Sequence, residues 1–145
     1  MSSRRVTVCG VAFVGLIVAL VSGCATTAQQ PALSDAKVVP AKASPGDKTL
    51  VQVKLVDPQG LVSVVVASVR EFPQISFDLK DNGENGDAVA GDGIWSHAME
   101  VPAAAPAGEY TWDFEAYDAD ISPVEVTAED GETVPLTAEA TAEVL

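Results

Sequence analysis

The stretch Tyr110–Tyr117, with the sequence YTWDFEAY, alternates apolar and polar side chains more clearly than any other part of the chain. Successive side chains of a β-strand point to opposite faces, so a period of two predicts a strand with one buried face. The apolar set consists of Tyr110, Trp112, Phe114 and Ala116. This parity favours core packing of the aromatic rings over an exposed platform for carbohydrate.

The segments on either side of this stretch repeat the same pattern. Alternating or β-branched runs separated by turn residues lie at 48–55, 61–69, 75–79 and 94–101. The segment Leu136–Leu145 is ambiguous, because its Ala and Glu content favours a helix while its strict alternation favours a strand; we expect the strand. Seven or so short strands without a convincing helix predict an all-β fold, a Greek-key β-sandwich of about seven strands.

The loop between two of these strands, Asp81–Gly93, is the most specific feature of the sequence. It contains four Gly, two Asn and four acidic residues in the order DNGENGDAVAGDG. Gly and Asn adopt positive φ angles at low cost, so the segment can coil and bring its carboxylates together. Convergent oxygen ligands are what Ca²⁺ prefers, and the sequence therefore predicts a calcium site.

Counting Asp81 as the first position gives a partial match to an EF-hand calcium loop. Asp81, Asn85, Asp87 and Asp92 fall on ligand positions one, five, seven and twelve of such a loop. The match fails at position three, which is Gly83, and Asp92 is shorter than the usual bidentate Glu. We take Asp81, Asn85, Asp87 and Asp92 as the candidate metal ligands. The alternative left open is a long hairpin loop whose acidic residues face water.

Several segments resemble the immunoglobulin-like domains of exported bacterial proteins. The likeness lies in Pro45-Gly46-Asp47, in the acidic loop running into Ile94-Trp95, and in Gly108–Thr111, and it is most specific at 86–93. It implies an immunoglobulin-like sandwich that serves as a binding, adhesive or spacer module, and it implies no catalytic residue. Such domains often have Tyr where this chain has Trp95.

The N-terminus predicts export. Two arginines precede an apolar run from Val6 to Val21 that is too short to span a bilayer comfortably, which is typical of a signal peptide. The following Val21-Ser22-Gly23-Cys24 resembles a bacterial lipobox. That resemblance implies cleavage before Cys24, a diacylglyceryl group on its sulfur and an acyl group, such as palmitate, on its nitrogen. Ala25 in place of Asp then favours the outer membrane in a Gram-negative cell.

These features divide the chain into three parts: a signal peptide at 1–23, a lipidated Cys24 with a flexible tether at 24–35, and the sandwich domain at 36–145. The formal net charge is −13, and no Lys or Arg follows Lys80, whereas 16 Asp and Glu do. This field repels nucleic acid and gathers cations, so we expect no nucleic-acid partner.

Enzyme chemistry finds little support in the sequence. His97 is the single histidine and shares strand parity with Trp95 and Met99, so we expect a structural role for it. Zinc would need several His or Cys ligands, and no Gly-x-Ser-x-Gly nucleophile motif is present.

The leading hypothesis is a membrane-anchored lipoprotein of the cell envelope, a non-catalytic binding or structural module that engages an envelope protein or a polysaccharide. One alternative is an accessory subunit that docks on an exported enzyme or envelope complex. The other is an envelope hydrolase with an unrecognised carboxylate site.

Overall fold

The computed structural model describes residues 29–145, and the expected signal peptide and Cys24 lie outside these residues. Within this range the chain contains β-strands and no helix, which confirms the all-β prediction. No segment there forms a helix long and apolar enough to cross a membrane. The strands are β1 (Ala32–Val39), β2 (Lys42–Ala43), β3 (Lys48–Val56), β4 (Val64–Val69), β5 (Phe72–Leu79), β6 (Ile94–Glu100), β7 (Gly108–Tyr117), β8 (Glu125–Thr127), β9 (Thr133–Pro135) and β10 (Thr137–Val144).

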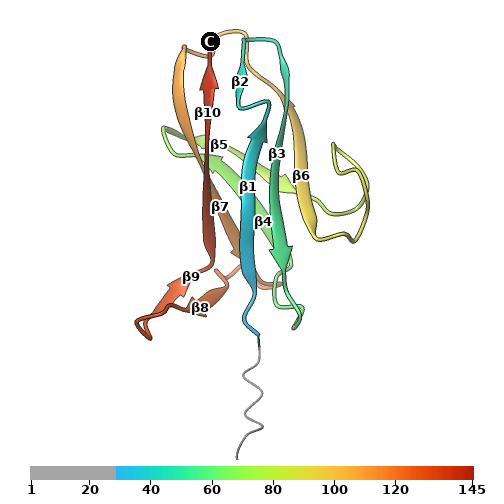
Figure 1. Ribbon diagram of the computed structural model, residues 1–145, viewed down its shortest axis with the longest axis vertical. Helices are drawn as coiled ribbons and strands as arrows, with labels where there is room; N and C mark the ends of the chain where they lie inside the picture. Colours follow the sequence, from blue (N-terminus) through green and yellow to red (C-terminus); the bar gives the residue numbers. More distant parts are fainter. Residues whose placement is uncertain (1–28) are drawn as a thin grey trace, which may run out of the picture.

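The longer strands form two sheets that pack against each other (Figure 1). One sheet has the order β1-β3-β6, the other has the order β2-β10-β7-β4-β5, and β8 and β9 form a separate hairpin at the lower end. All neighbouring strands are antiparallel except β2 and β10, which run parallel. Residues 137–144 of the segment 136–145, which was ambiguous in the sequence, form β10, and this confirms the strand prediction.

Three short strands exceed the number expected from the sequence. Seven of the ten strands have six residues or more, while β2 has two residues and β8 and β9 have three each. Strands this short carry too few side chains to display a period of two, so their pattern in the sequence is weak.

The first strand begins earlier than the expected domain start at residue 36. Ala32, Leu33 and Ser34 already pair with β3, and Leu33 lies opposite Leu55 and packs against the core. Asp35 has a positive φ of 51° at the irregularity between Ser34 and Lys37, where the pairing register shifts. The sheet therefore takes up the last part of the segment expected to be a tether.

The core lies between the two sheets and is built by alternate residues of their central strands. Val51 and Val53 of β3 face Val65 of β4 and Phe114 of β7, and all four are fully buried. Trp112 on β7 is 5% exposed. A second cluster, made of Ala116, Val124 and Leu136 with neighbouring apolar residues, extends the core.

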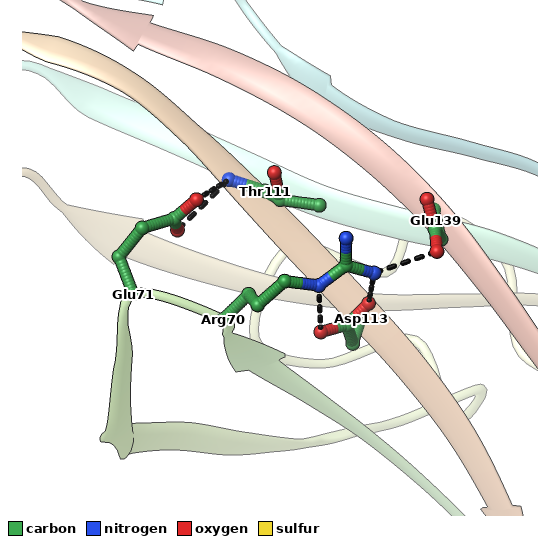
Figure 2. A network of polar contacts seen from close by, with 5 residues as sticks. All are labelled: Arg70, Glu71, Thr111, Asp113 and Glu139. Carbon is green, nitrogen blue, oxygen red and sulfur yellow. Dashed lines mark hydrogen bonds and ion pairs between the residues drawn. The ribbon is translucent and has the colours of Figure 1, made fainter.

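The outer face of the larger sheet carries a charged network that joins β4, β7 and β10 (Figure 2). Asp113 and Glu139 lie directly opposite each other on β7 and β10, an unfavourable pair of like charges. Arg70, which follows β4, donates from Nε to Asp113 at 3.0 Å and from Nη2 to Glu139 at 2.6 Å. These hydrogen bonds raise the pKa of Arg70, and the guanidinium offsets the repulsion between the two carboxylates.

Glu71 adds a backbone contact beside this network. Its carboxylate oxygens accept hydrogen bonds from the Thr111 N–H at 3.2 and 3.0 Å. Desolvation acts to raise the pKa of Glu71, but the hydrogen bonds from backbone N–H groups outweigh it and the pKa lies below its ordinary value. The turn between β4 and β5 is thereby fastened to the start of β7.

We predict that Phe114→Ala lowers the free energy of unfolding by about 3–5 kcal/mol, because it leaves a cavity at the centre of the core. Urea unfolding of residues 25–145 would measure the change. Leu61→Ala is the matched control, since Leu61 is 45% exposed and a surface truncation changes stability by about 0.5 kcal/mol or less. Equal losses in the two variants would contradict the assignment of Phe114 to the core.

Candidate metal site in the acidic loop

The acidic loop 81–93 connects β5 to β6 and lies along the outer edge of β6, at the right of the view in Figure 1. Lys80 and Ser96 exchange two backbone hydrogen bonds of 3.0 and 2.8 Å, and the Ala98 N–H donates to the Asn85 carbonyl at 2.7 Å. An uncovered edge would leave these groups open to pairing with another chain. The loop therefore covers the edge of β6 over this length.

Gly86 allows the loop to approach the sheet closely. Its φ is +95°, and a Cβ added there would lie 2.4 Å from Leu50 Cδ1 and 2.9 Å from the Ala98 Cβ. The preceding Asn85 also has a positive φ, 54°. The position thus needs glycine both for its backbone angle and for space.

The three aspartates hold the loop in shape through backbone hydrogen bonds. Asp81 Oδ1 and Oδ2 accept from the N–H groups of Gly91 and Gly93 at 2.8 and 3.0 Å, which closes the neck of the loop. Asp87 Oδ2 accepts from the Gly83 N–H at 2.7 Å. Asp92 Oδ1 accepts from the N–H two residues ahead, at 2.9 Å.

These hydrogen bonds bring the carboxylates together. Asp81, Asp87 and Asp92 each offer an oxygen, and the three oxygens lie within 4.8 Å of one another. Asp87 is 5% exposed, whereas Asp81 is half-buried and Asp92 is exposed. Three negative groups this close, one of them buried, repel one another unless a cation lies among them.

Three of the four candidate ligands therefore converge. Asn85, the fourth candidate, contacts β6 through its backbone. Its carbonyl oxygen accepts a hydrogen bond from the Ala98 N–H. Glu84, the remaining acidic residue of the loop, is exposed, and its carboxylate accepts a hydrogen bond from the Asn82 side chain at 3.3 Å. Ca²⁺ takes six to eight oxygens, so an ion here would complete its shell with backbone carbonyls and water.

His97 lies inside the sandwich, on the opposite side of β6 from the loop contacts. Its ring stacks on Phe77 with centroids 4.6 Å apart. Its Nδ1 is buried and has no hydrogen-bond partner within residues 29–145. The ring therefore fills space beside Phe77, between the two sheets.

The structure has a second feature, an apolar cleft between β5 and the end of β6. The sequence did not indicate this cleft. It arises because two strands that are consecutive in the chain belong to different sheets. Phe77 on β5 was an available signal, but the period of two that it shares with Ile75 and Leu79 predicted only a buried strand face, and Phe72 lies outside the expected strand 75–79.

No family model matches the chain, and no curated protein matches it. Among solved structures, it is similar to the alkylpurine DNA glycosylase AlkC of Pseudomonas fluorescens bound to DNA with an abasic site analogue. The identity is 13% and the TM-score 0.43, and the match covers 79% of this chain and 30% of that one. The chain thus spans less than a third of that protein. A likeness this distant says nothing about function here.

We predict that Gly86→Ala destabilises the protein more than Gly46→Ala does. Gly46 has nearly the same φ, +89°, but a Cβ there would meet nothing within 4 Å. Gly46→Ala therefore reports the backbone strain alone, about 1–2 kcal/mol, and Gly86→Ala adds the collision with Leu50 and Ala98. Urea unfolding midpoints of residues 25–145 would compare the two, and equal losses would contradict the close packing of the loop on β6.

Proposed function

We propose that this chain is a lipid-anchored protein of the bacterial cell envelope whose immunoglobulin-like domain is a non-catalytic binding or structural module stiffened by calcium. The observation that carries the calcium part is the convergence of Asp81, Asp87 and Asp92 within 4.8 Å, with Asp87 buried. The anchor rests on the sequence around Cys24.

The strand order supports an immunoglobulin-like Greek-key class for the sandwich. The chain passes from one sheet to the other between β3 and β4, between β5 and β6, and between β6 and β7. The last strand, β10, returns to pair with β7, while β1 lies at the edge of the opposite sheet. Greek-key sandwiches of this class are built from such crossings.

The placement of β1 fits a short connection to the membrane. Residues 25–31 separate Cys24 from the first strand, and they span roughly 25 Å when fully extended. A lipid group at Cys24 would hold the lower end of the sandwich, as seen in Figure 1, near the outer membrane. Several acyl chains on one residue give firm anchoring, whereas a single chain binds reversibly.

Calcium suits the loop better than a phosphate or a soft metal does. The ligands offered are carboxylate oxygens, which are hard donors, and they would repel an anion. An ion among Asp81, Asp87 and Asp92 would offset their repulsion and fix the loop along β6. Because the ion would bind only the folded loop, it would stabilise the whole domain.

We predict that millimolar Ca²⁺ raises the melting temperature of residues 25–145 relative to EDTA. Free calcium at about one hundred times its dissociation constant would add about 2.7 kcal/mol, which corresponds to a rise of several degrees or more for a domain of this size. Differential scanning calorimetry in the two buffers measures it. The double substitution Asp87→Asn, Asp92→Asn keeps acceptors for Gly83 and Ile94 but removes two charges, and it should abolish the rise.

The control for this experiment is Asp118→Asn, Asp120→Asn, which removes the same charge from a turn outside the loop. This variant should keep the calcium response of the parent protein. Identical melting curves of the parent in calcium and EDTA would rule out the ion and leave a hairpin loop that faces water.

We predict that cells making the full chain incorporate radiolabelled palmitate into it and that Cys24→Ser abolishes the label. The chain has two cysteines, and the other, Cys9, lies in the apolar part of the expected signal. Cys9→Ser is therefore the matched control and should keep both the label and the recovery of the protein in the membrane fraction. Label that survives Cys24→Ser would exclude Cys24 as the lipid site.

A further inference from the structure

Strand β5 stands last in the larger sheet, so one of its two sides is open. At its end, Lys80 exchanges two backbone hydrogen bonds with Ser96 of β6, so Lys80 directs its N–H and C=O groups away from β4. Successive residues of a strand direct these groups to opposite sides, and Asp78 and Ser76 therefore direct theirs to the same side as Lys80. Within residues 29–145, the backbone N–H and C=O groups of Asp78 and Ser76 have no hydrogen-bond partner.

The edge of β6 is covered, whereas that of β5 is not. The loop 81–93 bonds to β6 at Ala98, and none of its residues lines the cleft between β5 and β6. The protection of β5 is milder: Pro73 and an irregular register lie near its start, and the charged Asp78 lies near its end. Such features hinder the long pairing that leads to aggregation. They leave the part around Ser76 free to pair with a short strand.

The apolar cleft, with a volume of about 520 Å³, lies beside this open edge. Beyond the joint at Lys80, β5 continues along β4 and β6 continues along β3, in different sheets (Figure 1). Ile75 and Phe77 line the cleft and pack against the core, whereas Ser76 between them is exposed. The side chains of a strand added to β5 would alternate in the same way, so every second one would enter the cleft, which Trp112 also lines.

The open edge and the cleft together define the chemistry of the occupant. Unpaired N–H and C=O groups along a strand are satisfied by the backbone of another extended chain, and the cleft accepts apolar side chains at every second position. A small molecule would fill the cleft and leave the edge unpaired. The formal net charge of −13 makes two copies of this chain repel each other, so a different protein with a neutral or basic segment fits better than a second copy.

We propose that β5 and the cleft together bind an extended segment of another protein, neutral or basic, which pairs antiparallel with β5 and inserts alternate apolar side chains between β5 and β6. Backbone hydrogen bonds provide affinity in this kind of recognition, and the pockets for alternate side chains provide specificity. The proposal rests on the binding role proposed above and names the kind of partner. The acidic loop and Cys24 take no part in it.

The first test uses residues 25–145, which contain both sheets and both core clusters. The probe is a peptide of seven residues with blocked ends, in which Lys and Val alternate and Lys stands at both ends. The matched control has the same composition, with the three Val together in the middle. Fluorescence anisotropy of the labelled peptides should show at least tenfold tighter binding of the alternating one. Because the two carry equal charge, attraction to an acidic protein cannot produce this difference.

Methyl groups on the peptide backbone test the pairing itself. In antiparallel pairing, the residues opposite Ser76 and Asp78 have their side chains on the outer face, so the Lys N–H groups of the probe face β5 and the Val N–H groups face away. Methylation of the two inner Lys nitrogens should weaken binding at least tenfold, while methylation of two Val nitrogens should preserve it. Hydrogen exchange at the Ser76 amide should slow at least tenfold when the unmethylated probe binds.

A proline on β5 tests the same contact from the side of the protein. Ser76→Pro removes an N–H that the fold leaves unpaired, and proline is tolerated where the N–H of an edge strand faces solvent. It should weaken binding of the alternating peptide at least fivefold. Ala119→Pro is the control, in the turn closed by the Ile121 N–H and the Asp118 carbonyl, and it should bind the peptide as the parent does.

Three results would overturn the proposal: equal binding of the alternating and control peptides, equal effects of the two methylation patterns, or a dimer in analytical ultracentrifugation that Ser76→Pro dissociates. The last would mean that a second copy pairs with β5. The methylated peptides leave the protein unchanged, so they decide the question if Ser76→Pro does not fold. Melting in calcium and palmitate labelling are measured separately, so the calcium site and the anchor can fail without peptide binding, and peptide binding without them.

Discussion

Every second side chain of β7 enters the space between the two sheets, and this burial fixes the positions of the strands on either side. Trp112, Phe114 and Ala116 can leave water together only if both β4 and β10 pair with β7 in register and the opposite sheet covers them. A slip of one residue would turn these side chains outward and bring charged ones inward. The rest of the sandwich is arranged around this requirement.

The same register creates the electrostatic problem on the outer face, and a single arginine solves it. Asp113 and Glu139 face each other because their neighbours on β7 and β10 must be inside. Since no Lys or Arg follows Lys80, the compensating charge has to come from an earlier part of the chain. Arg70 supplies it from the turn after β4. A chain this acidic thus depends on where its few basic residues lie.

The sequence predicted what depends on local periodicity. The all-β class, the strand character of 137–144 and the burial of Trp112 and Phe114 follow from alternation alone. In the loop, the spacing of the acidic residues identified the three aspartates that converge. It could not show that the Asn85 carbonyl accepts a hydrogen bond from Ala98 on β6.

Features that depend on contacts between residues far apart in the chain could not be predicted from the sequence. The start of β1 at Ala32 is set by its pairing with Val56, which lies 24 residues later in the chain. The cleft depends on β5 and β6 joining different sheets, which no local pattern encodes.

The parallel pairing of β2 with β10 gives the sandwich a mechanical property. β1 starts at the lower end of the molecule and β10 ends at the upper end (Figure 1). Tension between these two points would run along the strands, through β1 into β2 and across to β10. The hydrogen bonds that the Glu143 and Leu145 N–H groups donate to the Ala41 and Ala43 carbonyls would then be sheared together and not opened one after another. Bonds loaded in this way would resist stretching along the long axis better than peeling from the side.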